Sequence, residues 1–584
     1  MKHHSVNPIR QEIVDWLEGN LPLQASRIEE LLEIPPSADM GDFALPCFEL
    51  AARMKKAPQQ IAAELAEDFT PTGGISAVKA AGPYLNFSVD REAMTADLLG
   101  RIYSRGSDYG RSDNKDRGTV VIDYSSPNIA KHLGVHHLRS AIIGRALYRI
   151  YRALGYEVEG INHLGDWGTA FGKLIVAYRR WGDGPTDDIT VSELQQLYVK
   201  FNQEAEKNPE LEDQARQAFR ALEEGDPDAT ELWKRFKEVS LAEFQRIYNM
   251  LGVSFDRYTG ESHYNDRLDD VLERLKESGL AERSQDALIV PLDDYDMPPL
   301  MLQKRDEGSL YATREICAAE DRWREFQFEK ALYVVGNEQK LHFQQVKQVL
   351  DLMGYEWADR IEHVDFGLLK FKDPETGKAK TGSTRSGEML LLEDVLTEGI
   401  EKAREKLQQN LDRLEDDADL DSLAADIGIG AVVFSDLCVR RTKDVIFDWD
   451  KMLDFEGATG PYLQYAHARL CSILRKSPDD VSPDVDFSCL ELPEEWSLVR
   501  KLEFFPEEIA RAADSNEPSI VANYLLELCT DFSAYYSAGM REKDRRVLCE
   551  DPDTRHARLL LVDAIRHVIR NGLTLLGIAA PERM

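Results

Sequence analysis

The spacing of apolar residues predicts a small domain of mixed structure at the beginning of the chain. Apolar positions recur at helical intervals over residues 9–34, whereas residues 75–90 read as two short β segments interrupted at Gly82-Pro83. A polar, glycine-containing stretch at 105–118 is typical of a linker. We therefore expect an α+β domain over residues 1–118.

Strands and helices alternate in the next part of the chain. Residues 119–124, TVVIDY, predict a buried strand, and apolar positions over 135–154 predict a helix. Another strand follows in YEVEGINHLG, after Gly155 has ended that helix. This order favours a βαβ unit of the nucleotide-binding kind and a parallel sheet across 119–375. Later strand candidates are residues 287–292, 331–336 and 363–371.

Two further regions are mainly helical in pattern. The stretch from about 176 to 286 is longer than one crossover connection needs and is rich in charged helix formers, so we expect a helical insertion there. From residue 425 to residue 584 the apolar spacing is helical throughout, which predicts an all-α C-terminal domain. Residues 376–424 would connect the two.

Composition limits the kinds of partner. Lys and Arg number 71 against 105 Asp and Glu, a formal net charge of −34, which argues against holding polyanions by bulk attraction. Contact with nucleic acid would have to be local. The seven cysteines are scattered without a CxxC pair, which argues against a disulfide framework or a thiolate zinc site. With no long apolar run, we expect a cytoplasmic protein without a membrane segment.

Three imidazoles crowd between the first strand of the sheet and its helix, at His132, His136 and His137. A zinc site, structural polar packing and an anion site are all open readings. The glutamate of an HExxH motif is absent, and the position at the carboxyl end of a strand favours an anion site.

A second candidate is the Gly-, Ser- and Thr-rich stretch 377–389, which carries Lys378, Lys380 and Arg385. By itself such a stretch is most often a flexible surface loop. As a phosphate clamp it would offer charge-assisted contacts to a triphosphate. The familiar glycine-rich phosphate loops are not matched at 168–174 or at 428–433.

Longer motifs occur in order along the chain. They are SSPNIAK at 125–131, NHLGDWGTAFGKL at 162–174, YATRE at 311–315, YVVGNEQKLHF at 333–343, GPYLQYAHAR at 460–469 and NGLTLLGIAAPERM at 571–584. With these motifs the chain closely resembles the arginyl-tRNA synthetases of class I over nearly its whole length. The resemblance implies an α/β fold: a Rossmann-type catalytic domain with a helical insertion, an N-terminal domain that contacts the tRNA elbow, and a helical anticodon-binding domain.

The resemblance also implies the reaction and its partners. L-Arginine would be activated by ATP to arginyl-adenylate and transferred to the 3′-terminal adenosine of tRNA(Arg). Magnesium would accompany ATP, and no metal held by the protein itself is expected. We further expect a monomer.

Site residues follow from the resemblance position by position. The arginine pocket would comprise Asp123, Ser126, Asn128, Tyr311, Glu315 and Gln339. ATP would contact Pro127, Asn128, Gly134, His137 and Gly336. Catalytic groups would be Lys131, His132, Gly134, His136, His137, Lys380, Ser383 and Arg385. Contacts with tRNA would come from Asn86, Arg440, Arg441, Tyr465, Arg469 and Met584.

Three departures from the family pattern stand out. Glu315 replaces the usual aspartate, so its carboxylate reaches one methylene further. The two-histidine motif reads Gly-Val-His-His at 134–137, so that only His137 is in register and either His132 or His136 would have to supply the second imidazole. The second motif, TGSTRSG at 381–387, lacks its lysines, for which Lys131 would compensate. An alternative is therefore a weak or inactive paralogue that binds tRNA or arginine for regulation.

Overall fold

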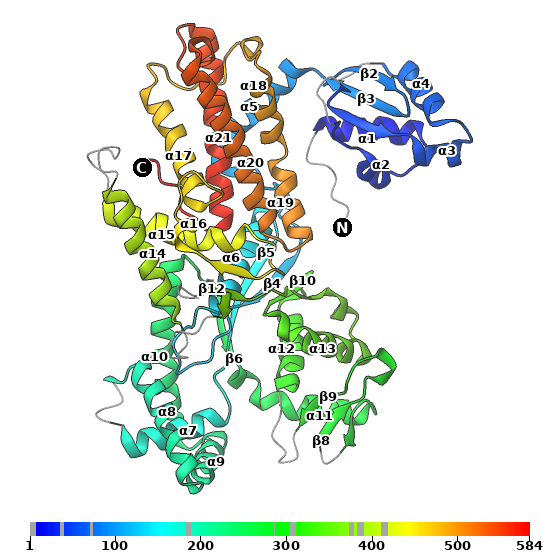
Figure 1. The fold of residues 1–584 in the computed structure, drawn as a ribbon. Helices are drawn as coiled ribbons and strands as arrows, with labels where there is room; N and C mark the ends of the chain where they lie inside the picture. Colours follow the sequence, from blue (N-terminus) through cyan, green and yellow to red (C-terminus); the bar gives the residue numbers. More distant parts are fainter. Residues whose placement is uncertain are drawn as a thin grey trace.

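The computed structural model describes most of the chain, and everything below concerns these residues. They are 8–35, 40–70, 74–182, 188–284, 287–303, 311–372, 379–381, 390–409 and 419–584. Figure 1 shows a central sheet with a helical bundle on one side, two lobes on the other and a separate N-terminal lobe. No helix in these ranges is long and apolar enough to cross a membrane.

The N-terminal lobe is an antiparallel sheet covered by helices, as the sequence predicts. Its strand order is β1-β3-β2, with β2 and β3 joined at Gly82-Pro83. The strands are β1 (Phe43–Pro46), β2 (Ile75–Ala81) and β3 (Tyr84–Val89), and the helices are α1 (Pro8–Asn20), α2 (Ala25–Leu31), α3 (Phe48–Met54) and α4 (Pro58–Asp68). Helix α5 (Arg91–Arg105), whose first turn is capped by the Asp90 side chain, leads into the rest of the molecule.

The central sheet has five strands in the order β11-β10-β4-β5-β6, all parallel. Its strands are β4 (Thr119–Tyr124), β5 (Glu157–Leu164), β6 (Arg257–Gly260), β10 (Lys330–Val334) and β11 (Ile361–His363). Helix α6 (His137–Ala153) forms the crossover from β4 to β5 and is buried along most of its length. The predicted parallel sheet and βαβ unit are thus confirmed.

The insertion is shorter than expected. Helices α7 (Thr169–Trp181), α8 (Val191–Lys207), α9 (Glu210–Glu223) and α10 (Pro227–Leu251) form one lobe. Gly252 then ends α10 with a left-handed backbone, and the chain returns to the central sheet as β6. The expected helical range of 176–286 therefore extends too far toward the C-terminus. The strand at 257–260 has only four residues and is flanked by charged residues, so it gives no clear apolar pattern in the sequence.

The predicted strand at 287–292 exists but lies in another sheet. Strands β7 (Glu282–Ser284), β8 (Ala287–Val290) and β9 (Leu300–Gln303) form an antiparallel sheet in the second lobe, with helix α11 (Leu268–Glu277). Only two residues separate β7 from β8, and so short a connection permits antiparallel but not parallel pairing. Helices α12 (Tyr311–Phe326) and α13 (Lys340–Leu352) flank the return to β10.

The predicted strand at 363–371 is divided between two sheets. Strand β11 ends at His363, and β12 (Leu369–Lys372) pairs with β13 (Ala379–Thr381) and with β14 (Val445–Phe447). The C-terminal part is therefore not helical throughout, because β14 interrupts it.

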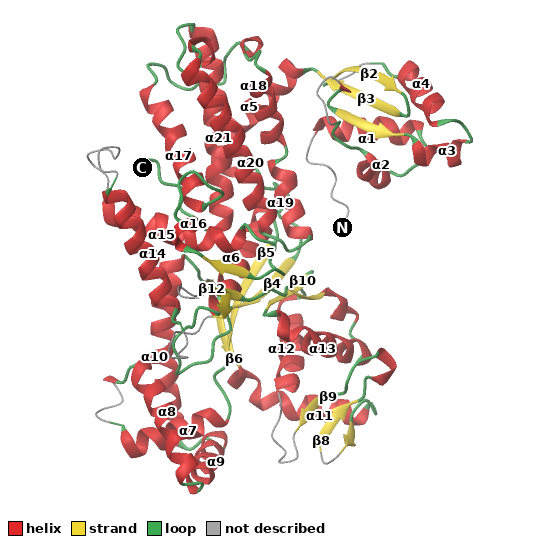
Figure 2. Cartoon of the chain, viewed as in Figure 1, coloured by secondary structure: helices red, strands yellow, loops and turns green. Residues whose placement is uncertain are grey.

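Helices make up the remainder of the C-terminal part, as Figure 2 shows. They are α14 (Leu392–Gln408), α15 (Leu420–Leu437), α16 (Trp449–Met452), α17 (Gly460–Lys476), α18 (Pro493–Glu503), α19 (Phe505–Asp514), α20 (Ser519–Arg541) and α21 (Pro552–Leu576). A single apolar cluster runs from α6, which packs on the central sheet, into α21, so the bundle and the sheet share one core.

One buried ion pair joins the crossover helix α6 to helix α15. Arg139 on α6 lies 2.8 Å from Asp436 on α15, and both side chains are 1% exposed. Arg139 Nη1 also donates to the carbonyls of Gly367 (2.8 Å) and Lys443 (2.9 Å). Burial raises the pKa of Asp436, against the effect of the nearby guanidinium.

We expect Arg139→Ala to lower the free energy of unfolding by about 3–5 kcal/mol, because it leaves a buried carboxylate without its cation. The double variant Arg139→Met/Asp436→Leu should be less destabilised than the single one, since no charge is stranded. Urea titration followed by circular dichroism measures both. Truncating the exposed pair Glu204–Lys207 is the matched control, with an expected effect within about 0.5 kcal/mol. If Arg139→Ala lowered the free energy of unfolding no more than this control does, the stabilising role of the buried ion pair would be contradicted.

Candidate active site

The loop that follows β4 is held in an unusual backbone shape. Ser125, Ser126 and Ala130 have backbone φ values of +76°, +47° and +61°, which residues other than glycine rarely adopt. The loop pairs with the end of β5, where the Gly165 amide donates to the Pro127 carbonyl (3.0 Å) and the Ile129 amide to the Gly165 carbonyl (3.2 Å). A Cβ at Gly165 would lie 1.9 Å from Asn128 Oδ1, so the motif glycine permits this approach. Strain of this kind is often found at functional sites.

Both carboxylate oxygens of Asp123, near the end of β4, accept hydrogen bonds from neighbouring side chains. Its Oδ1 accepts from Ser126 Oγ at 2.8 Å, and its Oδ2 accepts from Arg322 Nη2 at 2.5 Å. The Arg322 and Asp123 side chains are 3% and 6% exposed. A buried charge is costly unless its partner stays within hydrogen-bonding distance. The pair therefore holds α12 in a fixed position relative to the end of β4.

A second predicted carboxylate lies in the same cluster. Glu315 is buried on α12, and its charge acts on Arg322 and on Tyr333, whose pKa burial raises. Tyr264 faces the same group, and burial raises its pKa to about 12. Burial also lowers the pKa of His163 to about 4, although the charge of Asp123 opposes this shift. The cluster thus contains two carboxylates, one guanidinium and neutral rings.

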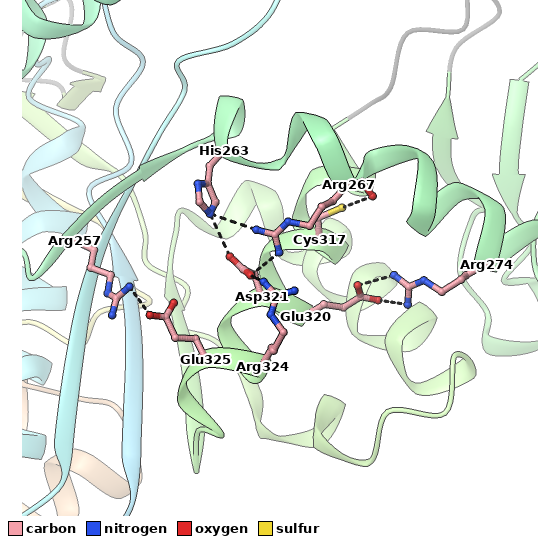
Figure 3. Close-up of polar contacts among 9 residues, drawn as sticks. All are labelled: Arg257, His263, Arg267, Arg274, Cys317, Glu320, Asp321, Arg324 and Glu325. Carbon is pink, nitrogen blue, oxygen red and sulfur yellow. Dashed lines mark hydrogen bonds and ion pairs between the residues drawn. The ribbon is translucent and has the colours of Figure 1, made fainter.

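The outer face of α12 is fastened by ion pairs (Figure 3). Arg274 donates to both oxygens of Glu320 at 2.8 and 2.7 Å. Arg267 donates to Asp321 at 2.5 Å, and Arg257 lies 2.6 Å from Glu325. Burial would raise the pKa of Asp321, but the hydrogen bond and charge of Arg267 keep it below its ordinary value. The helix that presents Glu315 and Arg322 is therefore braced from outside.

The predicted histidine motif forms a tight turn at the start of α6. The His137 amide donates to the Gly134 carbonyl at 3.0 Å, and His137 Nδ1 lies 3.1 Å from both the amide nitrogen and the carbonyl oxygen of Gly134. The rings of His136 and His137 are 3.9 Å apart between centroids. Burial lowers the pKa of His137 to about 3, so its imidazole is neutral. A helix N-terminus with neutral imidazoles suits an anion.

His132 does not join this pair. Its Nε2 lies 2.9 Å from Ser192 Oγ, and its Nδ1 lies 3.9 Å from Glu243, on helices α8 and α10 of the insertion. The ring therefore faces a cavity of about 600 Å³ between the insertion helices. This position argues against the catalytic role expected for His132 and leaves His136 as the second imidazole beside His137.

The segment on the C-terminal side of the second motif pairs with the histidine motif. The Val135 amide donates to the Leu390 carbonyl (2.9 Å), and the Leu392 amide donates to the Leu133 carbonyl (2.9 Å). Residues 390–392 follow the second motif directly. Ser383 and Arg385 lie outside the described residues, as does the side chain of Lys380, whose backbone is in β13.

The third part of the site is the turn after β10. Gly336 precedes the 3₁₀ turn Asn337–Gln339, and Gln339 is half-buried. The charge of Glu338 acts on His136, whose pKa burial lowers, so this turn lies beside the histidine motif. Pro127 is buried, Asn128 and Lys131 are exposed, and the Tyr311 side chain lies outside the described residues. Lys131 Nζ lies 5.6 Å from the Tyr198 ring centroid. Among the described residues, no group of three or more His, Cys, Asp or Glu could hold a metal ion.

The residues expected to contact tRNA are dispersed. Asn86 lies on β3 of the N-terminal lobe, away from the cluster around Asp123 (Figure 1). Arg440 is exposed between α15 and β14. Its neighbour Arg441 is half-buried, and its guanidinium is held by Asp365 and by the Asn516 carbonyl.

The remaining candidates lie together on the helical bundle. Arg469 Nη2 donates to Tyr465 Oη at 2.9 Å, and its guanidinium lies 4.5 Å from the Tyr465 ring centroid and 5.2 Å from that of Tyr536. It borders a cavity of about 310 Å³ with a partly basic lining that includes Lys476, Tyr536, Met540, Arg545 and Arg546. The chain end is tied to α17 by His467, whose Nδ1 lies 2.9 Å from the Pro581 carbonyl, and Met584 packs against the core.

Two residues of the cluster were not predicted. Arg322 follows Glu315 by seven residues on one helix, a spacing that places both on the same face, so the signal was present in the sequence. His163 belongs to the quoted NHLGD segment but had no role assigned. Its burial depends on Tyr264, which comes from a distant segment.

Comparisons with known proteins agree along the whole chain. Residues 99–449 match the family model of the tRNA synthetases class I (R) catalytic domain, 463–584 the DALR anticodon binding domain and 7–89 the arginyl tRNA synthetase N terminal domain. An arginine–tRNA ligase of Clostridium perfringens is 45% identical over 98% of this chain and 99% of its own. One from Halothermothrix orenii is 44% identical over 100% and 99%.

Solved structures show the same fold. The arginyl-tRNA synthetase of Thermus thermophilus has a TM-score of 0.81 and 26% identity, covering 99% of this chain and 100% of its own. That of Plasmodium falciparum has a TM-score of 0.81 and 23% identity, covering 100% of both chains.

The buried His163 predicts a proton-linked loss of stability in acid. Its folded-state pKa of about 4 lies below the ordinary value near 6.5, so the unfolded chain binds the proton first as pH falls. Its stabilising contribution is complete above about pH 6.5 and decreases by roughly 3 kcal/mol as pH falls to 4. We expect His163→Gln to show a shallower decline in unfolding free energy across this window. The difference in unfolding free energy between variant and parent at pH 8, where His163 is neutral in both states, gives the cost of lost packing. If the two curves of unfolding free energy against pH were parallel, the prediction would be contradicted.

Proposed function

Because the chain belongs to the arginyl-tRNA synthetase family and is an arginine–tRNA ligase, we propose that the cluster at the carboxyl ends of β4 and β10 binds arginine and ATP. The observation that carries this assignment is the buried group of Asp123, Arg322 and Glu315 where β4 ends, together with the Gly134–His137 turn where the following helix α6 begins. The reaction uses ATP, and Mg²⁺ would accompany it as part of the substrate complex.

The charges of the cluster suit a guanidinium substrate. Arg322 balances the charge of Asp123, so the three groups Asp123, Arg322 and Glu315 together carry about one negative charge. A substrate guanidinium has several N–H donors in one plane and pairs best with a carboxylate and neutral acceptors. Glu315 is the carboxylate that we assign to it, with Tyr311 and Gln339 as neutral partners. Asp123 then positions Ser126 and Arg322, and Asn128 lies at the rim.

The nucleotide would lie over the start of α6. The turn Gly134–His137 lies at the positive end of the α6 dipole, and the neutral ring of His137 can donate from Nε2. Pro127 and Gly336 border the same space. Lys131, with Lys380 and Arg385 from the second motif, would neutralise the β- and γ-phosphates, and the Ser383 hydroxyl would donate a hydrogen bond to them.

Catalysis would then consist of positioning and charge stabilisation. The arginine carboxylate attacks the α-phosphorus, the bond to the β-phosphate oxygen breaks, and pyrophosphate leaves with the electron pair. A hydroxyl of the 3′-terminal adenosine next attacks the arginyl carbonyl, and AMP leaves. His136 and His137 would donate to phosphate oxygens during the first step.

Recognition of tRNA would rely on local patches, because the chain as a whole repels a polyanion. The cavity beside Arg469 combines cations with aromatic rings, which is how unpaired bases and their phosphates are held. Tyr465, Arg469 and Met584 would contact the anticodon region, Arg440 its backbone and Asn86 the tRNA elbow. We propose that the enzyme acts as a cytoplasmic monomer.

Aminoacylation with arginine, using lysine and glutamine as controls, tests the pocket. We expect Glu315→Gln to lower kcat/KM for arginine by about 10- to 150-fold, because a charge-assisted hydrogen bond contributes about 1.5–3 kcal/mol, with KM for ATP nearly unchanged. Glu315→Asp keeps the carboxylate and should retain much more activity. An unchanged KM for arginine in Glu315→Gln would overturn the assignment.

The anticodon assignment is tested separately. Arg469→Ala should weaken equilibrium binding of tRNA by about tenfold, since one phosphate or stacking contact contributes about 1–3 kcal/mol, while KM for arginine stays constant. Filter binding at fixed salt measures this. Arg511→Ala, an exposed arginine paired with Glu508 on α19, is the matched control. Equal affinities of the two variants would refute the role of Arg469.

A further inference from the structure

A short segment links the central sheet to the C-terminal helices. Residues 364–368 connect β11 with β12. On one side the Asn337 amide donates to the Phe366 carbonyl at 3.1 Å, and Gly336 forms a parallel bridge with Phe366. This segment is therefore the backbone support of the turn that carries Gly336 and Gln339.

Two arginines that lie far apart in the sequence hold the other side of the segment. Arg139, on the helix that begins at the histidine motif, donates to the Gly367 carbonyl at 2.8 Å. Arg441, after α15, donates from Nη1 to both the carbonyl and the carboxylate of Asp365 at 2.5 Å. The Gly367 amide in turn donates to the Arg441 carbonyl at 2.9 Å. A Cβ at Gly367 would lie 2.7 Å from the Lys443 carbonyl carbon and oxygen. The backbone at Gly367 is therefore in close contact with the backbone at Lys443.

Arg441 also contacts the turn between α19 and α20. Its Nε donates to the Asn516 carbonyl at 3.1 Å, and its amide lies 3.2 Å from the Glu517 carboxylate. Asn516 is 4% exposed, has a φ of +50° and donates from Nδ2 to Glu362 on β11 at 2.7 Å. One guanidinium thus joins a buried turn of the anticodon-binding domain to the support of the Gly336–Gln339 turn.

We propose that Arg441 is a positioning residue for arginine binding and does not contact tRNA. It fixes residues 364–368, and through them Gly336 and Gln339, in a place set by the α19–α20 turn. A shift of these helices when tRNA binds would be passed to the amino-acid pocket along this path. The inference rests on the proposed pocket, which places Gln339 against the substrate. It replaces the tRNA contact expected for Arg441, because its guanidinium is already shared by Asp365 and Asn516.

The test compares Arg441→Ala, Arg441→Lys and Asp365→Asn with Arg511→Ala, whose arginine lies close by on α19 but pairs with Glu508. KM for arginine, equilibrium binding of tRNA and the melting temperature are measured for each. We expect Arg441→Ala to raise KM for arginine about tenfold, because charge-assisted hydrogen bonds that hold the support are lost, while tRNA affinity stays within twofold. For Arg441→Lys we expect a KM for arginine between those of the parent and Arg441→Ala, because a single ammonium nitrogen lacks the span of the guanidinium. For Asp365→Asn we expect the same rise in KM for arginine as for Arg441→Ala.

Two outcomes overturn the proposal. A tenfold loss of tRNA affinity in Arg441→Ala with unchanged KM for arginine would show that Arg441 binds tRNA directly. A lower melting temperature with neither constant changed would leave it a structural brace only. Gln339→Ala separates this inference from the pocket assignment. If Gln339→Ala raises KM for arginine while Arg441→Ala does not, the pocket stands and the coupling fails; if Gln339→Ala has no effect, the pocket itself is misassigned.

Discussion

Parallel pairing of β4, β5 and β10 brings the carboxyl ends of these strands to one edge of the sheet. Asp123, Asn162 to Gly165, and the turn at Gly336 meet there although they are far apart in sequence. Because side chains at such an edge approach from separate loops, each must be fixed by its own contacts. The strained loop after β4, the turn at Gly134 and the support under Gly336 supply these contacts.

Buried and half-buried arginines connect the layers of the molecule. Arg322 ties α12 to β4, Arg139 ties α6 to α15, and Arg441 ties the α19–α20 turn to the segment after β11. A guanidinium suits such joints because it donates in several directions at once and stays charged. Burying it is costly unless carboxylates and carbonyls surround it, and here they do. Each joint is thus sensitive to a small displacement of any partner.

The strongly acidic chain must still bind a polyanion. Diffuse attraction cannot serve, so recognition depends on places where aromatic rings and cations gather, such as Arg469 between Tyr465 and Tyr536. Most other arginines of the helical domain are paired with carboxylates, as Arg511 with Glu508 and Arg555 with Asp479. Pairing keeps the negative field in place elsewhere, which limits binding to nucleic acid that fits the local site.

The sequence alone determined the parallel sheet, the helical C-terminal domain and the family, because apolar periodicity and contiguous motifs are local properties. It failed at the short strands β6, β8 and β14, since a few residues pair in whichever sheet the surrounding chain presents. It also left open whether His132 or His136 lies beside His137. The role of a charged side chain depends on which distant groups are nearest to it, as Ser192 is to His132 and Asp365 to Arg441, and only the tertiary structure decides that.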